Sequence, residues 1–264
     1  MSTAILAMIS VAVICLVLGV IIGVVGKIFA VEINPLIETT EELLPGANCG
    51  GCGYAGCSDF AKALVAKEAE PAQCPVCSDK DLQSISSNLG ITSEEKEKMV
   101  AIVLCGGNNK TATSTIQYNG IIDCKAAASV AGGYKGCAYG CLGMASCARA
   151  CPFGAIEMKD GLAIVHPDLC VGCGKCVETC PRNLIKMVPA KAEVHVFCSS
   201  PEKGAAKKKV CSVSCIGCRK CVKASEEGQI SMNKFVAVVN YEYYPAPEVI
   251  EAAACPTNCI RKSQ

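Results

Sequence analysis

The residues with the clearest chemistry are four closely spaced cysteines, Cys170, Cys173, Cys176 and Cys180, followed at once by Pro181. They form the run CVGCGKCVETCP, in which the spacing is C-x2-C-x2-C-x3-C-P. Bacterial iron–sulfur proteins use this spacing to bind 4Fe–4S clusters, with three thiolates on one cluster and the fourth on another. Because such clusters carry single electrons and break no bonds themselves, the run predicts a protein that conducts electrons.

A second, stretched cysteine run lies upstream and also closes on a Cys-Pro pair. It reads Cys137-x3-Cys141-x5-Cys147-x3-Cys151-Pro152. Two such runs are the layout of a two-cluster ferredoxin, in which the last cysteine of each run crosses to the other cluster. One 4Fe–4S cluster is therefore expected on Cys137, Cys141, Cys147 and Cys180. The other is expected on Cys170, Cys173, Cys176 and Cys151.

A glycine-rich cysteine group near the N-terminus predicts another cluster. The stretch NCGGCGYAGC is followed by a distal Cys-Pro, and its candidate ligands are Cys49, Cys52, Cys57 and Cys74. The glycines let the backbone wrap closely and direct N–H groups at sulfur. Zinc is the alternative, since C-x2-C pairs also suit a tetrahedral zinc site. The x4 gap and the glycine density favour a 4Fe–4S cluster.

The C-terminal part repeats the central module in a degenerate form. MVAIVLC at 99–105 resembles AEVHVFC at 192–198, and KGCAYGC at 135–141 resembles KVCSVSC at 209–215. The fourth cysteine of the second ligand run is missing, because position 225 is Ser225. By the crossover rule one cluster survives in this copy. Its expected ligands are Cys215, Cys218, Cys221 and Cys255.

The remaining cysteines outside these runs include a possible fifth set of ligands. Four of them fall at corresponding or adjacent places of the two repeats: Cys105, Cys124, Cys198 and Cys211. They could form a further cluster that bridges the copies. The alternative is that they are buried thiols packed as small hydrophobic residues. Cys15, Cys77 and Cys259 receive no role.

Composition excludes several other classes of function. The 264 residues include 23 cysteines and no tryptophan, and the net charge of +1 gives no indication of nucleic-acid binding. The sequence has no Walker loop and no G-x-G-x-x-G opening a βαβ unit, so no flavin or NAD site and no catalytic residues are expected. His166 and His195 lie in no metal or catalytic motif. The basic run Lys207–Lys209 is either a solvated loop or a docking site for an acidic partner.

The N-terminus predicts a membrane anchor. Ala4 to Val25 carries no charge over 22 residues, enough for a helix of about 33 Å, which matches a hydrocarbon core of about 30 Å. A cleaved signal peptide is the alternative, but it would normally begin with positive charge. Lys27 follows the apolar segment, so the positive-inside rule places the N-terminus outside and the rest in the cytoplasm. Abundant cysteine suits that reducing compartment when the thiols bind metal.

The expected fold is α+β, with one transmembrane helix, a small four-cysteine lobe and tandem bacterial ferredoxin-like modules of βαββαβ type. A capping box at Thr92 and Glu95 is expected to begin a helix. The expected divisions are an anchor (1–29), a linker (30–46), a 4Fe–4S lobe (47–78), a helical connector (79–98), a double-cluster module (99–190) and a degenerate module with one cluster (191–264).

The order of these features resembles the B subunit of the Rnf-type ion-translocating ferredoxin:NAD+ oxidoreductase. The resemblance rests on the membrane helix, NCGGCGYAGC with its distal Cys-Pro, and CAYGCLGMASCARACPFGAI, which is similar to the longer form found in anaerobic bacteria. It implies a subunit that accepts electrons from reduced ferredoxin at the cytoplasmic membrane. It also implies partner subunits that carry the covalent flavins, the NAD site and the ion path.

Together these observations predict an electron-relay subunit of a membrane oxidoreductase complex, with four or five 4Fe–4S clusters and no substrate-converting site of its own. One alternative is the iron–sulfur relay subunit of a different membrane oxidoreductase. The other belongs to a different class of protein, a zinc-stabilised interaction protein tethered to the membrane.

Overall fold

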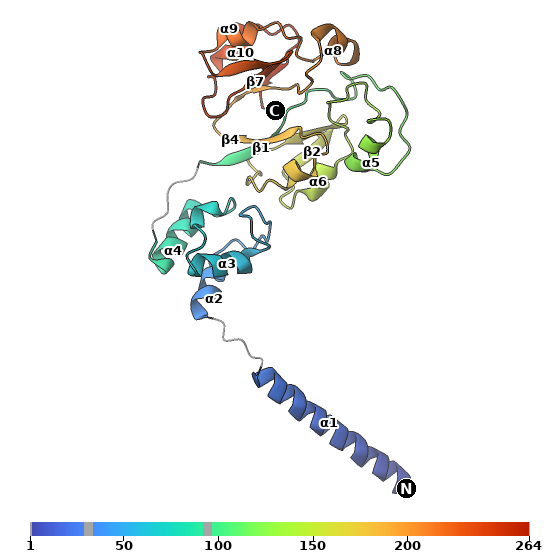
Figure 1. Ribbon diagram of the computed structural model, residues 1–264, viewed down its shortest axis with the longest axis vertical. Coiled ribbons are helices and arrows are strands. Elements are labelled where there is room, and N and C mark those ends of the chain that lie inside the picture. Colours follow the sequence, from blue (N-terminus) through green and yellow to red (C-terminus); the bar gives the residue numbers. More distant parts are fainter. Residues whose placement is uncertain (1, 29–33, 92–96, 264) are drawn as a thin grey trace.

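The computed structural model describes residues 2–28, 34–91 and 97–263 (Figure 1). It shows a long N-terminal helix, a small helical lobe, and two ferredoxin-like copies that lie at the far end of the molecule from that helix. The expected α+β fold with βαββαβ modules is confirmed. The capping box expected at Thr92 and Glu95 lies outside the described residues.

Helix α1 (Ser2–Ile28) is the predicted membrane anchor. Its segment Ile5–Lys27 has a mean hydropathy of 3.2, and none of it is buried against the rest of the protein. It is the single helix in the described part of the chain that is long and apolar enough to cross a membrane. Lys27 lies in its last turn, where a cation interacts favourably with the helix dipole.

The N-terminal lobe (residues 34–91) is built from α2 (Pro35–Glu42), α3 (Cys57–Val65), the 3-10 turn η1 (Pro71–Gln73) and α4 (Asp79–Leu89). Its core contains Phe60, Leu64 and Ile85, each at most 1% exposed. Ile85 comes from α4, so the helix expected as a connector packs onto the lobe. Ser78 and Asp81 form a reciprocal capping box that fixes where α4 begins.

The first copy (residues 99–189) has the element order of a ferredoxin. It runs through β1 (Met99–Val103), α6 (Ser146–Ala150), β2 (Ile156–Lys159), β3 (Leu162–Val165), α7 (Lys175–Thr179) and β4 (Ile185–Pro189). β1 pairs with β4 and β2 pairs with β3, both antiparallel. The β2–β3 turn lies at Asp160 and Gly161, whose φ angles are 49° and 72°, as expected for a type I′ hairpin. A long connection carrying α5 (Cys124–Ser129) separates β1 from α6.

The second copy (residues 194–262) repeats this arrangement. It comprises β5 (Val194–Val196), α8 (Gly204–Val210), α9 (Lys220–Ala224), β6 (Ile230–Asn233), β7 (Val236–Val239), α10 (Glu248–Ala253) and β8 (Ile260–Lys262). β5 pairs with β8, and β6 pairs with β7 over the same number of residues as β2 with β3. The internal repeat expected from the sequence is therefore present as two βαββαβ units.

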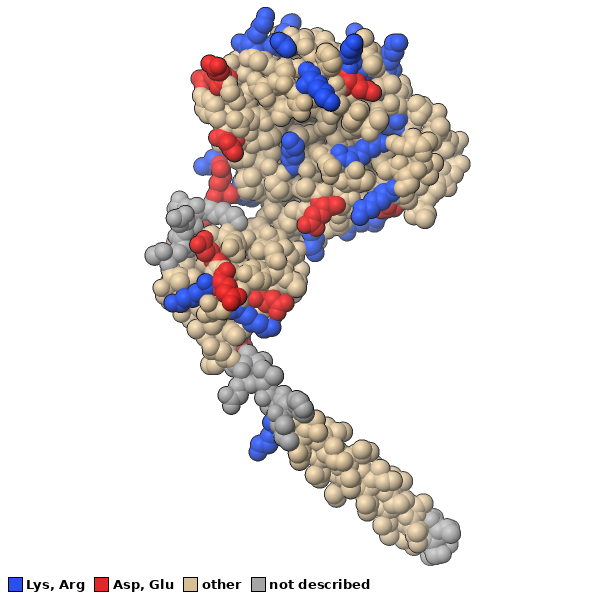
Figure 2. All heavy atoms as spheres, in the orientation of Figure 1, with Lys and Arg blue, Asp and Glu red and all other residues tan. Residues whose placement is uncertain are grey.

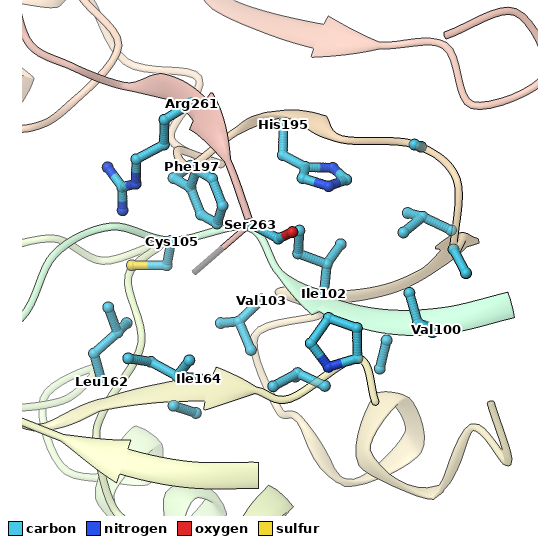
Figure 3. A pocket seen from close by; sticks show the side chains of 17 residues that line it. Val100, Ile102, Val103, Cys105, Leu162, Ile164, His195, Phe197, Arg261 and Ser263 are labelled. Carbon is cyan, nitrogen blue, oxygen red and sulfur yellow. The ribbon is translucent and has the colours of Figure 1, made fainter. Parts of the chain in front are cut away.

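The two copies face each other across a cavity of about 50 Å³ (Figure 3). Strands β1 and β3 line one side with residues such as Val100 and Ile164, and the second copy lines the other with Phe197, His195 and Arg261. The Arg261 guanidinium lies 4.2 Å from the centre of the Phe197 ring. A backbone hydrogen bond of 2.9 Å from Gly106 N to Phe197 O also joins the copies. The interface between the copies is thus packed and hydrogen-bonded.

Candidate metal centres

The cysteines gather around several small cavities in the protein. Among the described residues no two cysteines form a disulfide. No three His, Cys, Asp or Glu side chains in this part of the chain are grouped closely enough to hold a single metal ion. A zinc site, which needs four ligands around one ion, therefore has no candidate here. A set of four thiols around a cavity suits a larger, softer group such as an iron–sulfur cube.

The inner site is the group of cysteines that the crossover rule assigns to one cluster of the first copy. A single cavity is lined by Cys151, Cys170, Cys173 and Cys176. The Ala101 amide of β1 donates a 3.4 Å hydrogen bond to Cys170 Sγ. Helix α7 begins after Gly174, whose φ of 78° lets the ligand loop turn tightly into the helix. The structure therefore brings all four expected ligands together.

The middle site differs from the expectation in one residue. Its cavity is lined by Cys124, Cys141, Cys147 and Cys180, whereas Cys137 lies on the wall of another cavity. The reason is visible when the copies are compared. CLGMASC of the first copy lies where CIGCRKC lies in the second, so Met144 takes the place of Cys218. Cys124, at the start of α5, supplies the thiol that Met144 lacks.

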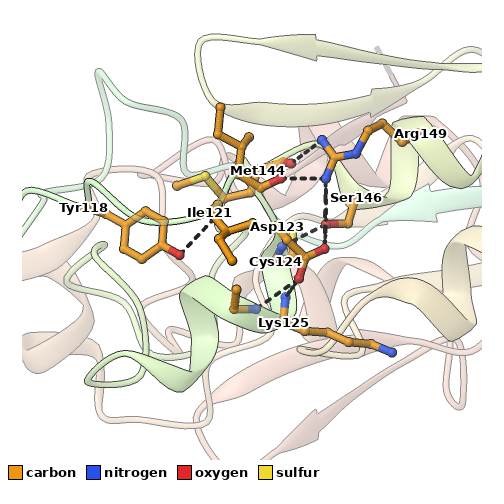
Figure 4. A network of polar contacts seen from close by, with 10 residues as sticks. Tyr118, Ile121, Asp123, Cys124, Lys125, Met144, Ser146 and Arg149 are labelled. Atoms are coloured by element: carbon orange, nitrogen blue, oxygen red, sulfur yellow. Dashed lines mark hydrogen bonds and ion pairs between the residues drawn. The ribbon is translucent and has the colours of Figure 1, made fainter.

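A polar network holds Cys124 against the loop that carries Cys147 (Figure 4). The Ser146 hydroxyl accepts a 2.8 Å hydrogen bond from the Cys124 amide and donates one of 2.8 Å to Asp123. Asp123 also caps α5, accepting hydrogen bonds from the amides of residues 125 and 126. Arg149 reaches the same carboxylate at 3.9 Å. These contacts lower the pKa of Asp123, the largest contribution coming from the Ala126 amide and the next from Ser146.

The outer site belongs to the second copy. One cavity is lined by the expected ligands and by one further cysteine: Cys215, Cys218, Cys221, Cys255 and Cys259. Cys218 is exposed at the protein surface. The Cys259 amide donates a 3.4 Å hydrogen bond to Cys255 Sγ. Helix α9 begins after Arg219, whose φ of 61° matches the 58° of Ala145 before α6. The ligand loops of the two copies therefore share one backbone shape.

Another cavity lies where the two copies meet, and we call it the bridging cavity. Its cysteines are Cys105, Cys137, Cys198 and Cys211. The expected fifth set therefore differs by one exchange, since Cys137 stands in the place proposed for Cys124. Both departures have the same origin: the sequence shows which cysteines exist but not how the long 105–135 connection folds.

The four cysteines of the lobe lie close to its core. Cys52, Cys57 and Cys74 belong to or pack against the hydrophobic core around Phe60, and Cys49 is buried. Cys57 opens α3, and its amide donates a 2.8 Å hydrogen bond to the Asn48 side chain. The glycine-rich loop is folded back on this helix, as its composition predicts.

Burial shapes the acidity of these thiols. It raises the pKa of Cys147 to about 12 and the pKa of Cys176 and Cys221 to about 11. Such thiols are neutral at pH 7, and a metal group that binds them must displace their protons. Hydrogen bonding with Cys259 instead lowers the pKa of Cys215 to about 5. Cys259 therefore lies beside the outer-site ligands and stabilises the thiolate form of Cys215.

The fit of an iron–sulfur cube to these sites rests on the donor set and the backbone. Each of the inner, middle and outer cavities presents at least four thiols, and backbone N–H groups already donate to ligand sulfurs. Such hydrogen bonds to sulfur tune cluster potentials in iron–sulfur proteins. The residues present are those that the group requires.

Two stretches of the chain match known family models. Residues 44–76 match the model described as a putative Fe–S cluster, and residues 163–186 match that of a 4Fe–4S binding domain. The first range contains the four lobe cysteines, and the second contains the run Cys170–Cys180. Iron–sulfur binding is thus supported for both parts of the chain.

Whole-chain relatives carry consistent names. The chain is 41% identical to the B subunit of the ion-translocating oxidoreductase complex of Methanosarcina acetivorans, over 93% of this chain and 91% of that protein. It is 41% identical to the B subunit of the proton-translocating ferredoxin:NAD(+) oxidoreductase complex of Clostridium ljungdahlii, over 99% and 93%. The Na(+)-translocating counterpart of Acetobacterium woodii is 37% identical over 93% and 74%. This chain therefore belongs to the family of B subunits of Rnf-type ion-translocating oxidoreductase complexes.

Proposed function

We propose that this subunit relays single electrons through 4Fe–4S clusters from a soluble donor to membrane partners. The observation that carries the proposal is that the inner, middle and outer cavities are each lined by at least four cysteines. The proposed ligands are Cys49, Cys52, Cys57 and Cys74 in the lobe, Cys151, Cys170, Cys173 and Cys176 in the inner site, Cys124, Cys141, Cys147 and Cys180 in the middle site, and Cys215, Cys218, Cys221 and Cys255 in the outer site. When bound, each cluster accepts and releases one electron without making or breaking a bond in a substrate.

Contacts between neighbouring ligand loops support a defined order of transfer. The lobe meets the inner site at Gly51, where an added Cβ would lie 3.0 Å from Cys173 Cα. The inner and middle sites share the first copy, because Cys151 and Cys180 end the two helices that pack together, α6 and α7. The lobe also follows α1 along the chain, so it is the natural outlet toward the membrane.

The protein's own residues hold the clusters, direct amide hydrogens at their sulfurs and keep water away. Cys147, Cys170 and Cys176 are less than 10% exposed. No flavin or NAD site is proposed on this chain, and we assign that chemistry to partner subunits. The names of the relatives state ferredoxin and NAD as reactants, and we propose reduced ferredoxin as the donor to this subunit.

The donor is proposed to dock at the outer site. Cys218 is the exposed ligand of the outer site. Exposed basic residues lie on or next to α8 and α9, the helices that precede and follow Cys218 in the sequence: Lys203, Lys208, Lys209, Arg219, Lys220 and Lys223. Figure 2 shows Lys and Arg side chains along the end of the molecule at which Figure 1 places these helices. A basic surface around an exposed ligand favours an acidic electron donor.

The chain is proposed to lie at the cytoplasmic membrane, with α1 crossing it once. Lys27 follows the apolar segment, and the positive-inside rule then places the lobe and both copies in the cytoplasm. Partner subunits would contact α1 and the lobe.

Iron and sulfide analysis of anaerobically purified full-length protein tests the relay. We expect a brown protein that dithionite bleaches, with about 16 irons from the four sites named above or about 20 if a fifth is filled. Electron paramagnetic resonance of the reduced protein should show signals from more than one cluster. Colourless protein that contains zinc and no iron would refute the proposal.

A further inference from the structure

The bridging cavity is a second kind of cysteine site, made equally by both ferredoxin-like copies. Cys105 and Cys137 come from the first copy, and Cys198 and Cys211 come from the second. Cys105 corresponds to Cys198 in the repeat, because each follows the first strand of its copy. Cys137 corresponds to Cys211, because each precedes a ligand loop by the same spacing (Cys137-x3-Cys141 and Cys211-x3-Cys215). The four cysteines therefore occupy two positions of the repeat, each present once in each copy.

The backbone around these cysteines is arranged alike at all four. Each sulfur accepts a hydrogen bond from the amide two residues further along the chain, and the donors are Gly107, Tyr139, Ser200 and Val213. Four thiols with the same backbone surroundings form a set of equivalent ligand positions, and backbone hydrogen bonds of this kind orient metal-binding sulfurs.

A glycine keeps space open between the copies. A Cβ at Gly107 would lie 3.3 Å from Cys211 Sγ and 3.8 Å from Cys105 Sγ. A side chain at this position would contact both sulfurs. The backbone therefore comes close to two thiols from different copies.

Two buried lysines lie beside the cavity without a carboxylate partner. Lys135 is 4% exposed and Lys207 is 1% exposed, and both line the cavity. Lys135 Nζ donates to the carbonyls of Gly107 and Gly161, and Lys207 Nζ to those of Ser200 and Phe235. Neither forms an ion pair among the described residues.

The carbonyls that these lysines contact follow the internal symmetry, although the lysines themselves stand at different positions of the repeat. Gly107 and Ser200 each lie two residues after a bridging cysteine, and Gly161 and Phe235 each lie in the hairpin turn of their copy. Buried cations are costly unless a negative charge balances them. Four thiolates around an iron–sulfur core carry net negative charge and would supply that balance from the cavity itself.

We propose that Cys105, Cys137, Cys198 and Cys211 bind a 4Fe–4S cluster shared by the two copies, which connects the middle site to the outer site. The proposal rests on the relay function proposed above and adds its fifth centre. The Cys141 amide of the middle site donates a 3.4 Å hydrogen bond to Cys105 Sγ. At the symmetric position, the Cys215 amide of the outer site donates to Cys198 Sγ. The bridging cavity is therefore in direct hydrogen-bonded contact with a ligand loop on either side.

Native mass spectrometry of the intact wild-type chain, prepared without oxygen, provides the first test. Five bound clusters, about 20 irons and 20 sulfides, are expected. Four clusters would overturn the bridging site and leave the relay through the other sites intact. Absence of iron would overturn the relay itself, so the two failures are distinguishable.

The double variant Cys137→Ala/Cys211→Ala provides the second test, with Cys15→Ala as the control that removes a cysteine of α1 outside every proposed site. The first variant should lose about one fifth of its iron and sulfide, and the control should lose none. An unchanged iron content in the first variant would overturn the proposal. If that variant does not fold, the iron content of the single variant Cys198→Ser and the number of clusters in the wild-type protein still test the bridging site.

Electron delivery gives a readout that a structural role would not change. Substoichiometric reduced donor, mixed with the folded double variant, should reduce the outer site as fast as in wild type. The middle-site signal should then appear at least about tenfold more slowly. Equal rates in both proteins would overturn the connecting role.

Discussion

Cys124 completes the middle site from a segment that has no counterpart in the second copy. It lies at the first position of α5, 20 residues before Met144, whose place in the ligand loop is taken by Cys218 in the other copy. A thiol lost from the ligand loop is thus replaced by one from the inserted connection. The hydrogen bonds among Asp123, Ser146 and the Cys124 amide hold Cys124 in this position.

This exchange predicts a rescue experiment. Cys124→Ala should lose one cluster, about four irons, because three thiols remain. The double variant Cys124→Ala/Met144→Cys should regain it, because it restores the C-x2-C-x2-C spacing found at Cys215–Cys221. Iron content and the reduced-state resonance spectrum measure both steps. If Cys137→Ala, rather than Cys124→Ala, removes the middle-site signal, the assignment of Cys124 is wrong.

His195 predicts a pH effect on stability. It is 1% exposed, hydrogen-bonded to the Tyr241 hydroxyl at 3.0 Å and packed near Phe197. Burial lowers its pKa from 6.5 to about 4. The unfolded chain takes up the proton first, so stability is complete above about pH 6.5 and falls as the pH drops toward 4, by up to about 3 kcal/mol.

Denaturant unfolding of the holoprotein between pH 7.5 and 5 measures this effect. His195→Gln should flatten the pH dependence, because no proton is then taken up on unfolding at this position. The matched control is His166→Gln, which removes a half-exposed imidazole that pairs with Glu157 at the surface. Equal slopes for wild type and His195→Gln would contradict the prediction.

At the scale of elements, the contact between the lobe and the first copy depends on one glycine. A Cβ at Gly51 would lie 2.8 Å from the Pro75 side chain and 3.1 Å from the Cys173 carbonyl oxygen. The glycine-rich loop can therefore approach the inner-site loop only because this position has no side chain. The approach brings Cys49 into the electrostatic neighbourhood of Cys173.

Gly51→Val should separate the two loops without removing a ligand. The iron content is expected to stay unchanged, while electron transfer between the lobe and the inner site slows by about tenfold or more, since tunnelling falls steeply with distance. The control Ala66→Val places the same side chain at an exposed position of the lobe. Rapid-freeze resonance spectra after flash reduction compare the rates, and an unchanged rate in Gly51→Val would contradict this route.

Most of the elements could be predicted from the sequence, because the signals are local. The hairpin at Asp160-Gly161, the strand before Cys105 and the repeat itself follow from turn residues, apolar runs and motif spacing. The exchange of Cys124 and Cys137 could not, since it depends on the path of a long connection. Only the comparison of CLGMASC with CIGCRKC contains a signal for it. The packing of α4 on the lobe was missed because a capped amphipathic helix does not specify its partner surface.

At the scale of the whole molecule, the charge distribution predicts how the donor binds. The exposed lysines of α8 and α9 lie at the end of the molecule far from α1, the same end as the exposed outer-site ligand Cys218, which directly precedes α9 (Figures 1 and 2). The net charge is only +1, so this basic end is balanced by acidic residues elsewhere. A local field of this kind accelerates encounter with an acidic protein.

Reversing two of these charges should slow electron uptake. Lys208→Glu/Lys209→Glu is expected to reduce the second-order rate of reduction by reduced ferredoxin by about tenfold at low ionic strength. The difference should shrink as salt screens the surface. Lys80→Glu, an exposed lysine on α4 of the lobe, is the control. Equal slowing by both variants would place the donor elsewhere.

Because both copies contribute cysteines to the bridging cavity, the order of synthesis determines when this site can form. A nascent chain can fold its lobe and its first copy as soon as β4 has left the ribosome, because domains fold as units during synthesis. The bridging cavity cannot close until Cys198 and Cys211 have also emerged and the copies have docked. An incomplete product would therefore lack the connection between its middle site and the donor surface of the second copy.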